Sequence, residues 1–115
     1  MQRFYRSEPP KLSNQIRYKM VQKYPPVHPG KILLEEFINC FGLTQATLAK
    51  ALGVPRRRIN EIVLKRRGIT ADTALRLAHF FGNEVNFWME IQMRYELEKA
   101  KRRLRGRLER EVQRL

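Results

Sequence analysis

The apolar positions of this 115-residue chain recur at helical spacing in five segments between about residue 29 and residue 98. Polar residues, together with residues that start or stop helices, separate these segments. A further apolar stripe continues toward the end of the chain. The pattern predicts an all-α fold, a compact five-helix bundle with an extended C-terminal helix, and the length accommodates one domain with tails.

The first helix is predicted to begin at Pro29, after a proline-containing loop, and to end near Phe41, where Gly42 follows. We interpret Cys40 as a core residue, because it falls within the apolar pattern of this helix. As the single cysteine it can form no disulfide within the chain, which fits a reducing cytosol. The predicted apolar face of the helix consists of Ile32, Leu33, Phe37, Ile38, Cys40 and Phe41.

The central segment, Thr44 to Arg67, predicts two short helices joined by a tight turn. Thr44 is a suitable N-cap, and Gly53 supplies the left-handed residue that ends the first helix. Pro55 suits the first position of the second helix, where no backbone donor is missed. The buried faces are predicted to be Leu48, Ala49 and Leu52 on the first helix, and Ile59, Ile62 and Val63 on the second.

Two short helices joined at a glycine are typical of a helix-turn-helix, whose second helix enters the DNA major groove by its N-terminal end. Arg56, Arg57 and Asn60 lie on the polar side of that helix, and these residue types read guanine and adenine through bidentate hydrogen bonds. We expect them to read bases. Contacts to the phosphate backbone are expected from Thr44, Gln45, Lys65, Arg66 and Arg67. The alternative interpretation is a plain helical hairpin with a solvated basic face.

The end of the second helix leaves two alternatives, because no glycine follows Val63 until Gly68. Either Lys65 takes a left-handed conformation at a steric cost, or the helix runs longer and Gly68 makes the turn.

The next helix is predicted to start after Thr70, its N-cap, and to stop at Gly82. The last helix of the bundle then starts at Asn83 or Glu84. The inward faces of the two helices are predicted to comprise Ala74, Leu75, Leu77, Ala78 and Phe81, then Phe87, Trp88, Ile91 and Tyr95. We interpret this last group of four as core or dimer interface rather than as a cofactor site.

The charge of +13 is concentrated at the two ends of the chain. Residues 1–24, a basic N-terminal extension, carry +5, and residues 99–115 carry +6, whereas residues 25–98, the predicted DNA-binding domain, carry only +2. Such ends commonly meet phosphate backbones or acidic protein surfaces, although a solubilising tail is the simpler alternative. The C-terminal end is predicted to be a basic amphipathic helix with the apolar stripe Leu97, Ala100, Leu104, Leu108, Val112 and Leu115.

The sequence offers no catalytic site. It has no glycine-rich phosphate loop and no nucleophile with an oriented base, and His28 and His79 do not make a metal-ligand set. We therefore expect a binding protein with no cofactor and no metal. No run of 18 apolar residues and no signal-peptide core are present, so we expect a cytoplasmic protein without a membrane partner.

Several motifs together resemble the HigA family of antitoxins, which carry a phage-repressor type of helix-turn-helix. The similarity extends over roughly residues 28–98. The motifs are His28-Pro29-Gly30-Lys31-Ile32-Leu33-x-Glu35-Glu36-Phe37, Gln45-x-x-Leu48-Ala49-x-x-x-Gly53-Val54, Arg58-Ile59-Asn60-Glu61-Ile62, Arg67-Gly68-Ile69-Thr70-Ala71-Asp72-Thr73-Ala74-Leu75-Arg76-Leu77 and Phe87-Trp88.

The resemblance implies an antitoxin that represses its own operon and neutralises a RelE/HigB-like, mRNA-cleaving toxin by forming a complex with it. Such modules act as homodimers on palindromic double-stranded DNA. The first alternative is a stand-alone phage-type repressor without a toxin. The second is an RNA-associated structural protein that uses its basic ends, against which the ordered helix-turn-helix spacing speaks.

Two expectations concern the ends of the chain. The resemblance implies a start only a few residues before His28, so Met20 is a candidate start, with residues 1–19 as an upstream extension. Alternatively this extension is a loosely attached segment, folds onto the core or binds DNA as an arm, and we favour loose attachment. For the toxin we favour the N-terminal side, because the basic C-terminal end would repel a basic ribonuclease.

Overall fold

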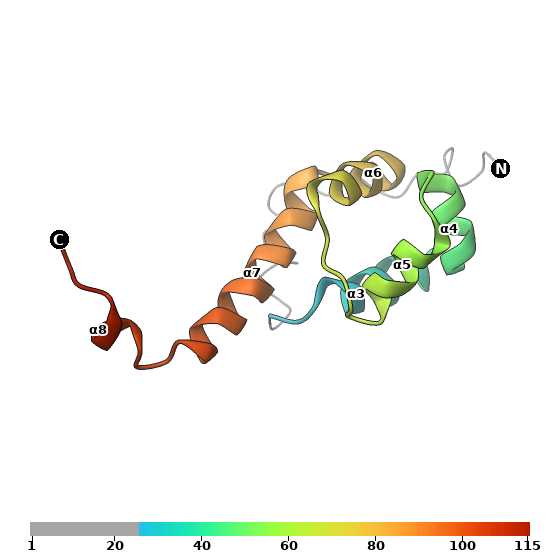
Figure 1. The fold of residues 1–115 in the computed structure, drawn as a ribbon. Coiled ribbons are helices and arrows are strands. Elements are labelled where there is room, and N and C mark those ends of the chain that lie inside the picture. Colours follow the sequence, from blue (N-terminus) through green and yellow to red (C-terminus); the bar gives the residue numbers. More distant parts are fainter. Residues whose placement is uncertain (1–25) are drawn as a thin grey trace.

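The computed structural model describes residues 26–115, and over this range all regular structure is helical (Figure 1). The expected all-α fold is therefore confirmed for the described part of the chain. The predictions for the segment before residue 26, including the start at Met20, lie outside the described residues. The elements are α3 (Pro29–Ile32), η1 (Leu33–Ile38), α4 (Gln45–Leu52), α5 (Arg56–Val63), α6 (Ala71–Phe81), α7 (Val85–Arg103) and α8 (Leu108–Glu111).

The first predicted helix consists of a short α-helical turn, α3, that continues into a π-helical segment, η1. His28 is the N-cap of α3, and its Nδ1 accepts a hydrogen bond from the Gly30 amide at 2.9 Å. In η1 the hydrogen bonds span five residues, as in the 2.9 Å bond from the Asn39 amide to the Leu34 carbonyl. The wider turn shifts the later positions out of the 3.6-residue pattern. Cys40 is consequently exposed, and its interpretation as a core residue was wrong.

Gly30 allows α3 to lie directly against α5. A Cβ atom at this position would overlap the carbonyl oxygen of Ile62 in α5. Only glycine permits two backbones to approach this closely. The residue thereby fixes how deeply α5 sits in the bundle.

One hydrophobic core holds the helices together: α3 packs against α5 and α7, η1 contacts α7 through Phe37, and α6 packs on α4 and α7. An aromatic cluster forms its centre. The Trp88 ring is fully buried, with its centroid 4.7 Å from that of Phe37 and 5.0 Å from that of Phe87. The Phe81 ring lies 4.9 Å from Phe37. The Trp88 Nε1 donates to the Asn83 side chain at 3.1 Å, so the indole nitrogen is satisfied.

Most of the predicted helix ends are confirmed. Thr70 is the N-cap of α6, and Gly82 ends that helix with φ of 74°. Glu84 is the N-cap of α7. Leu75 is the exception on α6: it was expected to face inward but is 57% exposed, because the buried stripe runs through Ala74 and Leu77 on the adjacent side of the helix.

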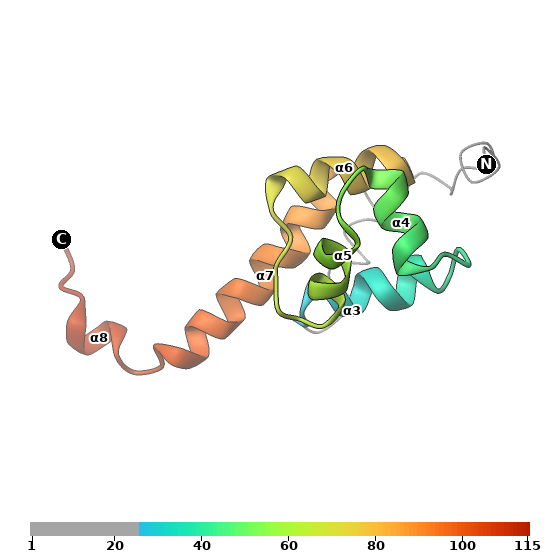
Figure 2. The same cartoon turned by 45° about the vertical axis from the view of Figure 1, so that its right-hand side comes forward.

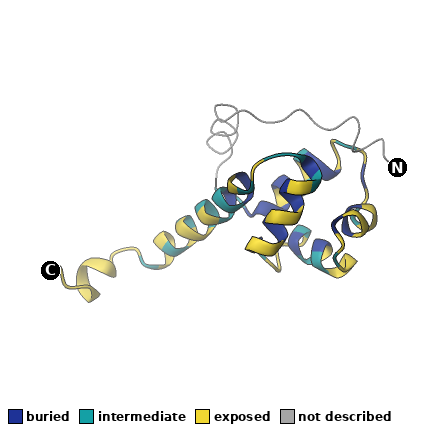
Figure 3. Cartoon of the chain, turned by 90° about the horizontal axis from the view of Figure 1, so that it is seen from above, coloured by how far each residue is buried: buried dark blue, intermediate teal, exposed yellow. Residues whose placement is uncertain are grey.

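The C-terminal arm, residues 99–115, differs from the single amphipathic helix that was expected. The helix α7 leaves the bundle and ends at Arg103, the chain turns at Gly106 with φ of 75°, and α8 adds one further turn (Figure 1). In Figure 3 the buried residues lie in the body, whereas the far end of α7 has only half-buried and exposed residues and α8 is exposed. With no surface to cover, the apolar stripe does not hold one continuous helix.

Candidate nucleic-acid interface

Helices α4 and α5 form the helix-turn-helix unit. The Thr44 hydroxyl accepts from the Thr47 amide at 3.0 Å and so caps α4, as expected. Gly53 ends α4 with φ of 73°. Pro55 lies one position earlier than predicted: it is the N-cap residue of α5, with φ of −64°, and Arg56 is the first helical residue. In Figure 2 the two helices lie next to each other, with α5 at the front of the body.

The two sides of α5 differ sharply in exposure. Ile59 and Ile62 have no exposed surface, because they anchor the helix in the core. Arg56, Arg57 and Asn60, the predicted base-reading residues, are all exposed. The helix thus presents long polar side chains along one side while its apolar side fixes its orientation.

The structure brings Asn60 and Gln45 together across the helix-turn-helix. The Asn60 Nδ2 donates to the Gln45 Oε1 at 3.0 Å. Gln45 is the first residue of α4 and was predicted to hold the phosphate backbone. A predicted backbone contact and a predicted base contact are therefore linked, and Gln45 restricts the rotamers that Asn60 can adopt.

Glu61 is a member of the site that sequence reasoning missed. Its carboxylate accepts from Arg57 Nε at 2.9 Å and from Arg67 Nη2 at 2.7 Å. These hydrogen bonds, from Arg57 first and Arg67 second, hold the pKa of Glu61 below its usual range. The Arg57–Glu61 spacing of four residues in a helix was the signal that predicts such a pair.

The turn after α5 settles the alternative that the sequence left open. Lys65 takes the left-handed conformation with φ of 65°, while Gly68 does not. The Arg66 amide donates to the Glu61 carbonyl at 2.8 Å, which ties the turn to the last turn of α5. The three basic residues Lys65, Arg66 and Arg67 are exposed and follow the recognition helix directly.

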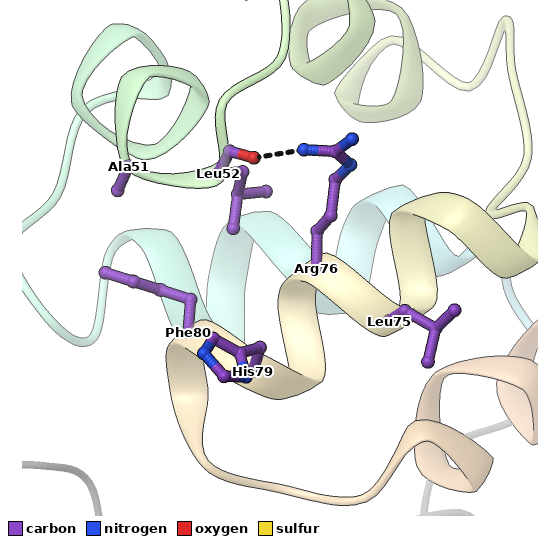
Figure 4. A pocket seen from close by; sticks show the side chains of 6 residues that line it. All are labelled: Ala51, Leu52, Leu75, Arg76, His79 and Phe80. Atoms are coloured by element: carbon purple, nitrogen blue, oxygen red, sulfur yellow. Dashed lines mark hydrogen bonds between the residues drawn. The ribbon is translucent and has the colours of Figure 1, made fainter.

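A second ion-pair network connects α4, α5 and α6, and it too was not foreseen. Asp72 accepts from Arg58 of α5 and from Arg76 Nε at 3.0 Å. The other side of the Arg76 guanidinium donates to the Leu52 carbonyl at 2.8 Å, at the C-terminal end of α4 (Figure 4). Hydrogen bonds from Arg58 and then Arg76 hold the pKa of Asp72 below its usual range. The network fixes the angle between α4 and α5 from the side of α6.

A groove of about 460 Å³ lies between α4 and α6 and is lined by Ala51, Leu52, Leu75, Arg76, His79 and Phe80 (Figure 4). None of the residues predicted to contact DNA lines it. The exposed Leu75 side chain forms part of its wall.

Phe87, Trp88 and Ile91, three of the four candidates for a dimer interface, are at most 4% exposed within one chain. A side chain that is already buried has no surface left to bury against a second subunit, so these three are core residues. Tyr95 is half-buried, and its ring lies edge-on against His28 with centroids 5.0 Å apart.

Neither a metal site nor a membrane span is found in the described part of the chain. Over residues 26–115, no three His, Cys, Asp or Glu side chains are grouped as metal ligands. None of the helices in this range is long and apolar enough to cross a membrane.

Comparison with known proteins places this geometry in a defined class. A protein-family model described as helix-turn-helix matches residues 41–88, which run from the turn after η1, through α4, α5 and α6, to the first residues of α7. The fold, the match and the relatives below define a DNA-binding helix-turn-helix protein.

Individual relatives show to which family of helix-turn-helix proteins the chain belongs. The chain is 53% identical over 76 residues to virulence-associated protein I of Dichelobacter nodosus, covering 66% of this chain and 70% of that protein. It is 36% identical over 75 residues to antitoxin HigA-1 of Vibrio cholerae, covering 65% and 70%. The solved structure of Pseudomonas aeruginosa antitoxin HigA with the higBA promoter superposes with a TM-score of 0.74 at 41% identity, covering 79% of this chain and 99% of that one. The chain belongs to the HigA family of helix-turn-helix antitoxins and transcription regulators.

Proposed function

We propose that this protein is the antitoxin of a type II toxin–antitoxin module, and that it represses its own operon and neutralises an mRNA-cleaving toxin of the RelE/HigB type. The observation that carries the proposal is the exposed polar side of α5, with Arg56, Arg57 and Asn60 at its start, in a chain of the HigA family. Both activities require the compartment that holds DNA and translated mRNA, so the proposed location is the cytoplasm.

In the proposed complex with DNA, α5 enters the major groove. Arg56 and Arg57 bind guanine, and Asn60 binds adenine. Thr44 and Gln45 at the start of α4 contact one phosphate strand, and Lys65, Arg66 and Arg67 contact the backbone beyond the end of α5. Arg57 and Arg67 both form ion pairs with Glu61 in the free protein. On binding DNA, each arginine either gives up this ion pair for a bond to DNA or keeps it and binds DNA with its remaining N–H groups.

One recognition helix reads too few base pairs for a useful specificity, so we propose a homodimer on a palindromic operator, with half-sites roughly 34–36 Å or a multiple of this apart. Among the described residues of α7, Met93 and Leu97 offer exposed apolar surface at 53% and 51%, four residues apart on one side of the helix. They replace the buried aromatic residues as the proposed contact between subunits. Leu97→Glu is expected to shift the protein from dimer to monomer in sedimentation equilibrium, and an unchanged dimer would rule this surface out.

For the toxin, the proposed surface remains on the N-terminal side, at the first helix and the segment before it. The C-terminal arm carries +6, and like charges across an interface with a basic ribonuclease reduce affinity.

The test is coexpression of the protein with each immediate genomic neighbour, with the affinity tag on the neighbour. Co-purification at fixed stoichiometry supports an antitoxin. If the protein is recovered only by itself, bound to its upstream DNA, it is a stand-alone repressor. If it prefers RNA to duplex DNA, both readings fail.

A further inference from the structure

A polar cleft of about 150 Å³ lies where the turn after α5 meets the side of α7. Figures 1 and 2 show the connection from α5 to α6 passing beside α7. The Ile69 amide in this connection donates to Gln92 Oε1 at 2.7 Å, which fixes the turn to the helix. The lining residues are His28, Lys65, Arg66, Arg67, Gly68, Gln92, Tyr95, Glu96 and Lys99.

The charge of this cleft favours an anion. Four of its lining residues are cationic, and within the described part of the chain Glu96 is the carboxylate among them. Glu96 Oε2 accepts from Gln92 Nε2 at 2.8 Å and keeps its charge, and Arg67 is already paired with Glu61. Lys65, Arg66 and Lys99 together outweigh the one carboxylate of the lining. Lys99 is held at the cleft by the Tyr95 ring, whose centroid lies 5.3 Å from Nζ.

His28 also lines this cleft. The residue is 7% exposed, and its Nδ1 accepts from the Gly30 amide, which places the ring proton of the neutral form on Nε2. Burial, followed by the charges of Lys65 and Lys99, lowers the pKa of His28, while Glu96 opposes the shift. The two lysines come from elements more than thirty residues apart in sequence, and they act on one ring because both converge on this cleft.

We propose that this cleft binds a phosphate group of the operator backbone, with Lys99 of α7 as a contact in addition to Lys65 and Arg66. The inference rests on the proposed operator binding and extends the DNA contacts beyond the helix-turn-helix. Lys65 and Arg66 follow the recognition helix within three residues of its end, and the Arg66 amide is bonded to α5. A phosphate strand that flanks the groove occupied by α5 therefore passes the cleft. Lys99 is followed on the same side of α7 by Arg102 and Arg103, which continue the basic surface along the arm.

The chain offers a matched control on the same helix. Lys101 carries the same charge and is exposed, but it lies about 200° around α7 from Lys99. The experiment compares wild type, Lys99→Gln and Lys101→Gln in operator binding across a range of salt concentrations. For Lys99→Gln we expect the slope of log K against log salt to fall by about 0.9 for each bound subunit, because one phosphate contact is lost. Lys101→Gln is expected to keep the wild-type slope.

Equal slopes for the two variants, whether both changed or both unchanged, would overturn the proposal while leaving operator binding intact. Failure of the wild-type protein to bind its operator would instead overturn the proposed function. In a second experiment, inorganic phosphate is titrated into the protein while the His28 ring signals are followed by NMR. If phosphate shifts these signals and Lys99→Gln leaves the operator slope unchanged, the cleft binds a small free anion, and its assignment to the DNA backbone is wrong.

Discussion

The bundle of residues 26–98 and the C-terminal arm have the same kind of helical sequence pattern and very different structures. In the bundle, each apolar stripe meets another, and most helices begin and end where their caps predict. In the arm, α7 ends at Arg103, the chain turns at Gly106, and Leu108 and Val112 of the apolar stripe remain 49% and 59% exposed. The difference shows that a helical period predicts a stable helix only where a second surface covers it.

The largest expected effect comes from comparing a core residue of the bundle with an exposed apolar residue of the arm. Trp88→Ala removes the centre of the aromatic cluster and is expected to lower the free energy of unfolding by about 3–5 kcal/mol. Leu108→Ala in the arm is expected to change it by less than about 0.5 kcal/mol. Urea denaturation followed by circular dichroism measures both. A large loss for Leu108→Ala would mean that the arm packs on the body in solution.

The second prediction separates base reading from backbone contact on the body. Asn60→Ala is expected to relax the base preference at one operator position, at a cost of about 1–3 kcal/mol on the preferred base. Arg66→Ala is expected to weaken binding to all duplexes alike and to reduce the salt slope by about one for each subunit. Binding to a panel of single-base operator variants distinguishes them, and the same pattern for both variants would refute the assigned roles.

The third prediction concerns pH at the junction of the bundle and the arm. Because the pKa of His28 is lowered in the folded protein, the unfolded chain takes up its proton more readily. Its contribution to stability is complete above the ordinary value of about 6.5 and falls as the pH drops from there through the folded-state pKa. Chemical denaturation between about pH 7.5 and about pH 5 measures this loss. Wild type is expected to lose more stability than His28→Asn, a variant that keeps an acceptor for the N-cap hydrogen bond but has no imidazole to titrate. His79 is present in both proteins and contributes equally to the two curves of stability against pH. If the curves for wild type and His28→Asn run parallel, the pH dependence does not come from His28.

The smallest expected effect is on the arm alone. Gly106 has φ of 75°, where alanine is strained, but alanine is favoured over glycine by roughly 1 kcal/mol in a helix. Gly106→Ala is therefore expected to join α7 to α8 and raise the helical signal in far-ultraviolet circular dichroism, with the unfolding midpoint in urea unchanged. A lower helical signal would show that the turn at Gly106 is held by contacts of the arm.

Local chemistry accounts for what the sequence could predict. Thr44, Gly53, Thr70 and Gly82 were found as helix ends because each acts through its own backbone or side chain within a few residues. Cys40 and Leu75 were placed wrongly because a π-helical segment and a shift of the packed stripe depend on the neighbouring helices. The Arg57–Glu61 and Asp72–Arg76 pairs were visible as four-residue spacings. The ion pair between Arg58 and Asp72 and the cleft at Lys99 join residues that only the tertiary fold brings together.

We propose that this bundle reads a specific DNA sequence upstream of its own gene. The most direct test is a competition measurement by fluorescence anisotropy at fixed salt, with a duplex from that region against a scrambled duplex of equal length and composition. We predict a preference for the natural duplex of at least about 10³-fold, the lower end for specific DNA-binding proteins. Equal affinity for the two duplexes would contradict the account and reduce α5 to a basic helix without sequence recognition.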